Sequence, residues 1–251
     1  MRAMSHWWAL VLLSPLLLQE DPIAAEALQG YRHPWADFGN GTTVTYRETM
    51  RRPDIDKSGN LIYKAVTSDV TWTVLAAAGE KTTFKIEGGG QESLIPYFIT
   101  SPSWARGKGE RRGTEEIEVG GVKRVCTVTA ISLDADKDAG QVTTICKSSE
   151  VPYWAVRWRV ETLMKGKPNT SEEEVVLEVD RRLKVGDKEL SCVVVLSTVE
   201  TPGGVKTVRK EWRCDEVPGR VVRREGRQFM NGKEVESSVT QMDVVKFQSK
   251  R

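Results

Sequence analysis

The sequence predicts an all-β protein built on one long, curved antiparallel sheet, a half-barrel or barrel-like fold. Segments that alternate apolar and polar residues recur at short intervals between turns rich in Gly, Pro and Asp. No segment of helical length repeats its apolar residues with a period near 3.6. A block of about 50 residues that carries two cysteines occurs twice, and such self-similarity indicates a repeated structural unit.

The duplicated block spans residues 119–167 and 185–233. Each copy has a Val-Pro dipeptide (151–152 and 217–218) and closes with Gly-Lys at the same distance after the proline (166–167 and 232–233). We interpret each copy as a four-strand unit. The predicted organisation is a signal peptide at 1–27, N-terminal antiparallel strands at 28–114, and cysteine-bearing units at 115–167 and 168–251 that share one continuous sheet.

The chain begins with the pattern of a secretory signal peptide. Arg2 precedes an apolar run at residues 7–18, and Ala25-Glu26-Ala27 offers small residues around a cleavage site. We therefore expect a secreted or periplasmic protein; an uncleaved N-terminal anchor is the alternative. The apolar run is too short to span a bilayer, and no later run reaches about 18 residues, so no membrane span is expected after cleavage.

Alternation places the expected strands with their turns. In the N-terminal part they cover residues 42–50, 61–67, 69–76 and 81–87. In the two units they cover 125–131, 142–147, 156–164, 191–199, 205–214 and 221–230, with 172–184 between the units and 239–247 at the end. Residues 93–114 are expected to form an irregular connection that packs on the core or covers the mouth of the sheet.

Four cysteines in an exported chain predict disulfides. The duplication favours one bond per unit, Cys126–Cys146 and Cys192–Cys214; another pairing and free thiols are the alternatives. No Cys-x-x-Cys occurs, and His33 is the one histidine that would remain after signal cleavage, so no metal site and no cofactor are expected.

Charged segments point to solvated strand faces. The formal net charge is only +2, and the basic clusters at 106–112 and 220–227 contain glutamates, so nucleic acid is not an expected partner. The acids at 172–174 are adjacent in a strand and alternate between its two faces, which favours a solvated edge over a catalytic pair. The segment from Asp54 to Gly59 has half of a calcium-loop pattern, but Ala65 stands where a bidentate Glu is needed, which favours a hairpin turn.

Aromatic residues supply the candidate ligand-binding positions. Tyr153, Trp154 and Trp158 follow the first Val-Pro, and the aligned residues of the second unit are not aromatic. The fold of the unit therefore does not need these aromatics, which favours a binding role. Trp104, in the irregular stretch, is the fourth candidate. Core packing is the alternative for all four.

Three segments carry a resemblance to a known class. They are Gly-Thr-Thr-Val-Thr-Tyr at 41–46, the Val-Gly strand that leads to each first cysteine, and Glu-Val-Pro-Gly-Arg-Val-Val at 216–222. This pattern resembles uncharacterised exported bacterial β-sheet proteins that are similar to periplasmic lipoprotein carriers with half-barrel folds. The resemblance implies an all-β fold, a non-enzymatic role and no catalytic residues.

The leading functional hypothesis is an exported, non-enzymatic protein of the cell envelope that binds a lipid or another apolar or amphipathic ligand on a concave sheet face. One alternative is a hydrolase of glycans or peptides that works with carboxylates alone. The other is a surface module that binds a protein partner through a sheet edge.

Overall fold

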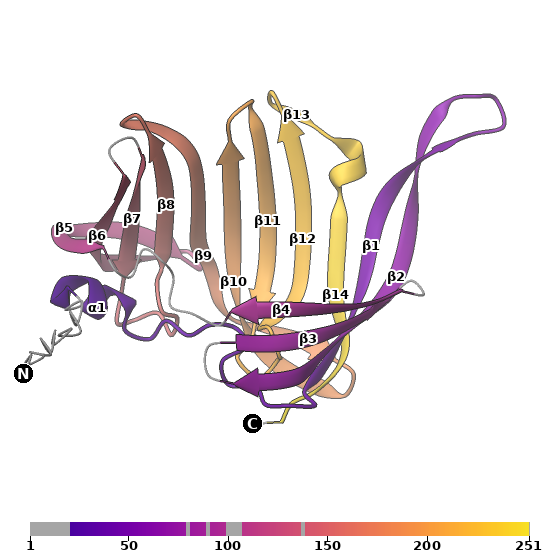
Figure 1. Cartoon of the computed structure of the whole chain (residues 1–251), viewed down its shortest axis with the longest axis horizontal. Helices are drawn as coiled ribbons and strands as arrows, with labels where there is room; N and C mark the ends of the chain where they lie inside the picture. Colours follow the sequence, from indigo (N-terminus) through magenta and orange to yellow (C-terminus); the bar gives the residue numbers. More distant parts are fainter. Residues whose placement is uncertain (1–20, 79–80, 89–90, 99–106, 137–138, 251) are drawn as a thin grey trace, which may run out of the picture.

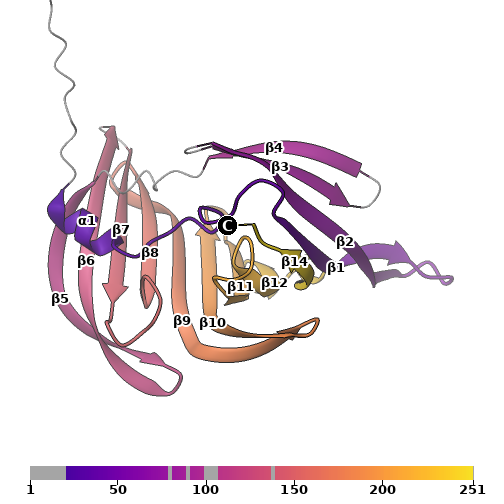
Figure 2. The ribbon, with the colours of Figure 1, turned by 90° about the horizontal axis from the view of Figure 1, so that it is seen from below.

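One antiparallel sheet dominates the molecule. The computed structural model describes residues 21–78, 81–88, 91–98, 107–136 and 139–250. Fourteen strands form this sheet in the order β4-β3-β2-β1-β14-β12-β11-β10-β9-β8-β7-β6-β5, and β13 pairs with β12. The sheet curls so that β3 and β4 fold back over one side while the end strands β4 and β5 stay unpaired with each other (Figures 1 and 2). The predicted all-β fold with one long, curved antiparallel sheet is confirmed, and the sheet is open, as in a half-barrel.

The elements follow the chain in three groups. The N-terminal group contains α1 (Pro22–Leu28), β1 (Thr43–Ile55), β2 (Leu61–Ala78), β3 (Lys81–Gly88) and β4 (Gln91–Phe98). The middle strands are β5 (Lys108–Val119), β6 (Val122–Asp136), β7 (Ala139–Lys147), β8 (Arg157–Met164), β9 (Lys167–Val185), β10 (Lys188–Thr201), β11 (Val205–Arg213) and β12 (Val221–Met230). The chain closes with β13 (Lys233–Glu234), a 3₁₀ turn (Glu236–Ser238) and β14 (Thr240–Gln248).

Two expectations about strands need correction. Residues 61–67 and 69–76 form one strand, β2, because β-branched and aromatic residues continue through the junction. The stretch 93–114 is not an irregular connection: it contains most of β4 and the first half of β5. Both are edge strands, where Pro96 and a register shift at Gly113 are tolerated because one side of the strand has no ladder to complete.

Two hairpin turns show how the sequence sets strand register. Lys165-Gly166 joins β8 to β9 with φ values of 52° and 70°, and Asn231-Gly232 joins β12 to β13 with φ values of 50° and 78°. Positive φ at both central residues is the geometry of type I′ turns, whose twist matches that of the strands. These turns occupy matching positions of the two predicted units; the duplication itself stays a prediction.

Three clusters of buried side chains form the core. The first surrounds Tyr46 and Trp212 and joins β1, β10, β11 and β14. The second joins β5 to β9 around Cys126, Cys146 and Val176. The third seats Ala24 and Ala27 of α1 against Ile131 and Ile145 of β6 and β7. An open sheet of this size therefore buries its apolar residues in separate patches along its length.

The predicted disulfides are wrong: all four cysteines are free thiols, and all are buried. Cys146 lies opposite Val128, so Cys126 is its diagonal neighbour, and diagonal Cβ atoms stand about 7 Å apart where a disulfide needs about 3.8 Å. Cys192 precedes Val193 and Cys214 follows Arg213, the residues that pair at the end of the β10–β11 ladder. A hydrogen bond from the Cys192 thiol lowers the pKa of Cys214 to about 7.

The N-terminal helix α1 covers one end of the sheet. Asp21 caps it by accepting hydrogen bonds from the backbone N–H groups of Ile23 and Ala24 (2.9 and 3.1 Å). The helix overlaps the end of the predicted signal peptide, whose first 20 residues lie outside the described part; that signal stays a prediction. Within the described ranges, no helix has the length and apolar character needed to cross a membrane.

Candidate functional site

The segment that joins α1 to β1, residues 29–41, runs across the concave side of the sheet near one end (Figure 2). We call it the crossing segment. Lys147 Nζ donates a hydrogen bond to the carbonyl of Gln29 (2.8 Å), and Arg220 Nη1 donates one to the carbonyl of Arg32 (2.9 Å). Its far end is held by the N–H of Gly41, which donates to the carbonyl of Val74 (2.7 Å). Side chains of the sheet thus hold an irregular segment over the concave face.

Trp35 anchors the crossing segment by ring packing. Its ring stacks on Trp72 with centroids 6.1 Å apart and meets Phe84 edge-on at 4.6 Å. Gly219 lies directly beneath, where a Cβ atom would stand 2.8 Å from the Trp35 ring, and its φ of +76° is one that glycine adopts without strain. The glycine of the second unit therefore makes room for the crossing segment.

A cavity of about 520 Å³ lies between the crossing segment and strands β8 to β12. Five arginines line it: Arg32, Arg209, Arg213, Arg220 and Arg224. Three glutamates and five aromatic residues also line the cavity: Glu172, Glu174, Glu211, Tyr31, Trp35, Tyr153, Trp154 and Trp158. A cavity of this size accepts a small organic ligand.

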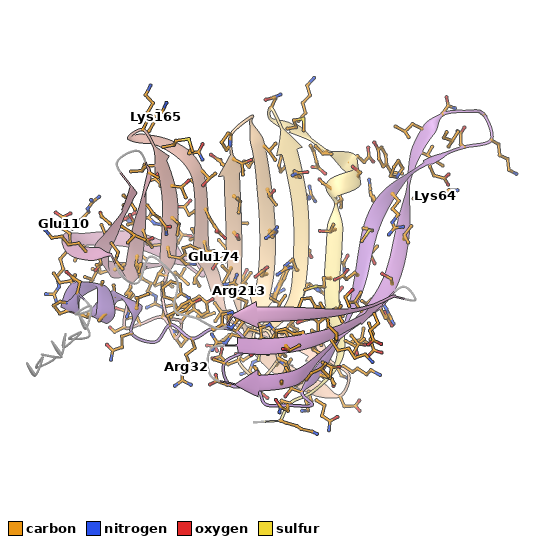
Figure 3. The ribbon with its side chains drawn as sticks, viewed as in Figure 1. Arg32, Lys64, Glu110, Lys165, Glu174 and Arg213 are labelled. Carbon is orange, nitrogen blue, oxygen red and sulfur yellow. The ribbon has the colours of Figure 1, made fainter. Side chains whose placement is uncertain are left out.

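Arg213 is the centre of a buried ionic network. Its Nη1 and Nη2 donate to the two oxygens of Glu174 (2.8 and 2.5 Å), and its Nε donates to Glu211 Oε2 (2.8 Å). Nη1 also donates to the Tyr153 hydroxyl (2.8 Å). Figure 3 shows Glu174 and Arg213 close together on the concave side. Burial works against the charge of Arg213, but Tyr153, Glu174 and Glu211 raise its pKa well above the usual value.

Glu211 joins this network to β12. Arg224 Nε donates to Glu211 Oε1 (2.5 Å) across the β11–β12 ladder, where the two residues are direct partners. Burial would raise the pKa of Glu211, but the charges of Arg213 and Arg224 outweigh it and hold that pKa below its usual value. Only 4% of the Glu211 side chain is exposed, so this carboxylate depends on its arginines.

The acids at 172–174 are not a solvated edge. Alternation along β9 sends Glu173 to the outer face and Glu172 and Glu174 to the cavity, and the Glu174 side chain is only 10% exposed. Trp158 Nε1 donates to Glu174 Oε2 (2.7 Å) from the neighbouring strand. Burial, with the nearby charge of Glu174, raises the pKa of Glu172. The alternation argument was correct, but it separates only Glu173 from the other two.

Three of the four predicted ligand residues come together at this cavity. Tyr153, Trp154 and Trp158 all line it, and the Trp154 ring contacts Tyr31 edge-on at 5.1 Å and Trp158 at 6.2 Å. All three are half-buried and pack against the buried core clusters. Their position is thus compatible with core packing and with contact to a ligand in the cavity. Trp104 lies outside the described residues.

The charged residues of the cavity were missed from sequence. Arg209, Glu211 and Arg213 occupy alternate positions of β11 and so share one face. Charges on alternate positions of a strand that lies in the middle of a sheet are the signal that could have found them. In the described ranges, no group of three or more His, Cys, Asp or Glu side chains could hold a metal ion.

The arrangement favours binding of a negatively charged group. Arginines outnumber glutamates five to three in the cavity lining. Arg213 and Arg224 are paired with Glu174 and Glu211, and Arg32 and Arg220 are paired with Asp37 and Asp215. Arg209 is exposed and makes no hydrogen bond or ion pair within the described ranges, although its charge acts on Glu172 of the same cavity and works against the rise in the pKa of that carboxyl. A free guanidinium at the edge of a partly covered cavity can donate two parallel hydrogen bonds to a carboxylate or phosphate.

Comparisons with known proteins leave the fold and the cavity as the guides to function. No protein-family model, no curated protein and no solved structure matches this chain. The resemblance to lipoprotein carriers therefore stays a prediction.

Proposed function

We propose that this protein is an exported binding protein of the cell envelope whose cavity takes an anionic amphipathic ligand. The observation that carries the proposal is the cavity itself: an excess of arginine and a group of aromatic rings meet under a segment that shields them from solvent. The acidic group of the ligand contacts Arg209, and its apolar part lies against Trp154 and Trp158.

Charge selects the class of ligand. Glu174 and Glu211 accept hydrogen bonds from Arg213 and Arg224. These carboxylates therefore hold the arginines in place and offer little attraction for a cationic ligand. Arg209 adds an exposed positive charge that makes no ion pair with the residues that the structure describes. A charge-assisted hydrogen bond contributes roughly 1.5–3 kcal/mol, enough to separate an acid from a neutral analogue by tenfold or more.

The surfaces around the cavity suit an amphipathic molecule better than a wholly apolar one. Strands β8 to β10 continue beyond the aromatic rings, and valines and threonines occupy the positions of these strands that face the cavity side. They include Val160, Thr162, Thr170 and Val199. Such a face accepts an aliphatic chain and still tolerates water when the ligand is absent.

A displacement titration tests this function. The probe is a dansyl-labelled undecanoic acid, and the competitors are palmitic acid and palmityl alcohol. We expect palmitic acid to displace the probe at least tenfold better than the alcohol. Arg209→Gln should remove most of that difference, since it deletes the unpaired guanidinium without breaking the buried network. The control is Arg159→Gln, which alters an exposed arginine paired with Glu161 on the other face of the sheet.

Three results would refute the proposal: no binding of the probe, equal displacement by acid and alcohol, or an equal loss in the Arg209→Gln and Arg159→Gln variants. Each would show that charge recognition in the cavity does not select the ligand.

Carboxylate-dependent hydrolysis is a second candidate, favoured by one observation. Glu172 has a raised pKa, as the general acid of a glycosidase has, and a second carboxylate, Glu174, lies two residues away on the same strand face. However, Glu174 and Glu211 both accept hydrogen bonds from Arg213, which leaves Glu172 as the carboxylate in the described lining without an ion pair. Binding is therefore the function that the geometry supports best.

A further inference from the structure

We infer that one rim of the sheet docks onto an anionic lipid surface. The rim consists of four turns: residues 55–61, 164–167, 201–204 and 230–233. We call it the turn rim. Strands β1, β8, β10 and β12 run in the same direction in the strand order, so the turns that follow them lie at one end of the sheet. Figure 1 shows these four turns reaching the same end, opposite the crossing segment.

Exposed apolar side chains gather on the turn rim. Ile55 and Leu61 are 68% and 63% exposed and face each other across the β1–β2 hairpin. Met164 and Met230, at matching positions of the two predicted units, are 57% and 53% exposed. These four are among nine large hydrophobic residues recorded as exposed in the described ranges. Large apolar side chains at the tips of turns have no core to join, so they mark a contact surface.

Lysines flank these apolar side chains. Lys57, Lys165, Lys167 and Lys233 are exposed, and none of them makes an ion pair within the described ranges. Figure 3 shows Lys165 projecting from the end of the sheet, away from Glu174 and Arg213. The turn rim therefore presents unpaired positive charge beside methionine, isoleucine and leucine.

The carboxylates near the turn rim do not cancel this charge. Asp54 is paired with Lys64, Glu200 with Lys206 (2.9 Å) and Glu234 with Arg227 (3.4 Å). Asp56 accepts hydrogen bonds from the backbone N–H groups of Ser58 and Asn60 (2.8 Å each), which closes the β1–β2 turn. The described part of the rim thus has a net positive charge.

This composition fits a membrane surface better than a folded partner. A lipid interface accepts apolar tips that are spread over several turns, because it has no shape of its own to match, and its anionic headgroups attract each nearby lysine. The neighbouring turns are held in place: the Asn231 N–H donates to the carbonyl of Gly204 (2.9 Å). This hydrogen bond holds the turn that carries Met230 and Lys233 beside the 201–204 turn, so both can meet the same surface.

Vesicle co-sedimentation of the full chain tests this inference. The vesicles contain either phosphatidylcholine alone or phosphatidylcholine with 30% phosphatidylglycerol. We expect binding only to the anionic vesicles, and weaker binding at high salt. Replacing Lys57, Lys165, Lys167 and Lys233 by Gln should weaken binding by roughly several hundredfold, since each lysine contributes about fivefold. Met164→Ser with Met230→Ser should weaken it further.

Matched controls separate the turn rim from general charge. One variant replaces four other exposed lysines by Gln: Lys108, Lys123, Lys184 and Lys246, of which Lys123 is paired with Glu116. The other replaces Val122 and Val125, which are exposed away from the rim, by Ser. Both controls should bind anionic vesicles as the unchanged protein does. The inference fails if the unchanged protein does not bind, if it binds neutral vesicles equally, or if a control loses as much as its rim counterpart. Rim variants keep the cavity, so their displacement of the dansyl probe should be normal whatever the vesicle result.

Discussion

Arg213 shows how one residue organises the concave face. Its guanidinium is shared between Glu174, Glu211 and the Tyr153 hydroxyl, and only 17% of its side chain is exposed. A buried carboxylate without its cation is far more costly than a surface one, because the desolvation of the charge is no longer offset. The network therefore behaves as a unit, in which the loss of one member strands the others.

We expect Arg213→Met to lower the free energy of unfolding by about 3–5 kcal/mol, because it leaves Glu174 and Glu211 buried with fewer partners. Urea unfolding followed by tryptophan fluorescence measures this. Arg159→Gln, on the exposed outer face, should cost about 1 kcal/mol or less. Equal losses in the two variants would show that the buried network adds no stability.

The two cavity carboxylates predict opposite dependence on pH. The folded pKa of Glu211 lies below its unfolded value of 4.5, so its contribution to stability is present above pH 4.5 and is lost as pH falls through the folded pKa. The folded pKa of Glu172 lies above 4.5, so its contribution is complete below pH 4.5 and is lost as pH rises through the folded pKa.

Urea unfolding of Gln variants from pH 3 to pH 8 tests these signs. At pH 7, Glu211→Gln should be less stable than the unchanged protein and Glu172→Gln more stable. Both differences should shrink as the pH falls, since both glutamates become protonated. A Glu172→Gln variant that is less stable at pH 7 would contradict the raised pKa of Glu172.

Among the elements, the crossing segment packs on Gly219, a position whose role the sequence alone does not explain. Gly219 aligns with Tyr153 in the predicted duplication, and the aromatic residue of this pair is the one that sequence predicts to be functional. The structure shows that the glycine copy matters too, because Trp35 lies against it. Sequence patterns predict which residues alternate within a strand, but they do not show which distant segment packs on its face.

We expect Gly219→Ala to lower stability by about 2–4 kcal/mol, from backbone strain and from displacement of Trp35. Gly186→Ala is the matched control: it has a similar φ of +58° with open space around it, so only backbone strain of about 1–2 kcal/mol applies. Limited trypsin digestion should also cut at Arg32 faster in Gly219→Ala alone. Equal stability and equal cleavage of the two variants would contradict the role of Trp35.

At the scale of elements, the sequence predicted central strands better than edges. Strands such as β10 and β12 follow their alternation, whereas β4 and β5 carry Pro96 and Gly113, and the sequence predicts an irregular connection there. Edge strands have weak patterns because one side of their backbone needs no partner. Charge was misjudged for a related reason: a glutamate in β9 appears solvated until an arginine from β11 is brought beside it.

For the whole molecule, the long curved antiparallel sheet was predictable, whereas its open edges and the state of the cysteines were not. Strand alternation, short turns and the duplication all point to a continuous antiparallel sheet, and that sheet is present. Disulfides depend on register to within one residue, which cysteine spacing does not determine: the diagonal placement of Cys126 and Cys146 keeps both as thiols. The covered cavity arises only when the crossing segment meets five strands.

The central claim is that this cavity holds an anionic amphipathic molecule. Native mass spectrometry of the protein, isolated without detergent from the cells that produce it, tests the claim most directly. We predict a fraction of the protein with a bound small acid that is absent from the Arg209→Gln variant and present in Arg159→Gln. Only unliganded protein, or the same bound mass in all three forms, would contradict the claim.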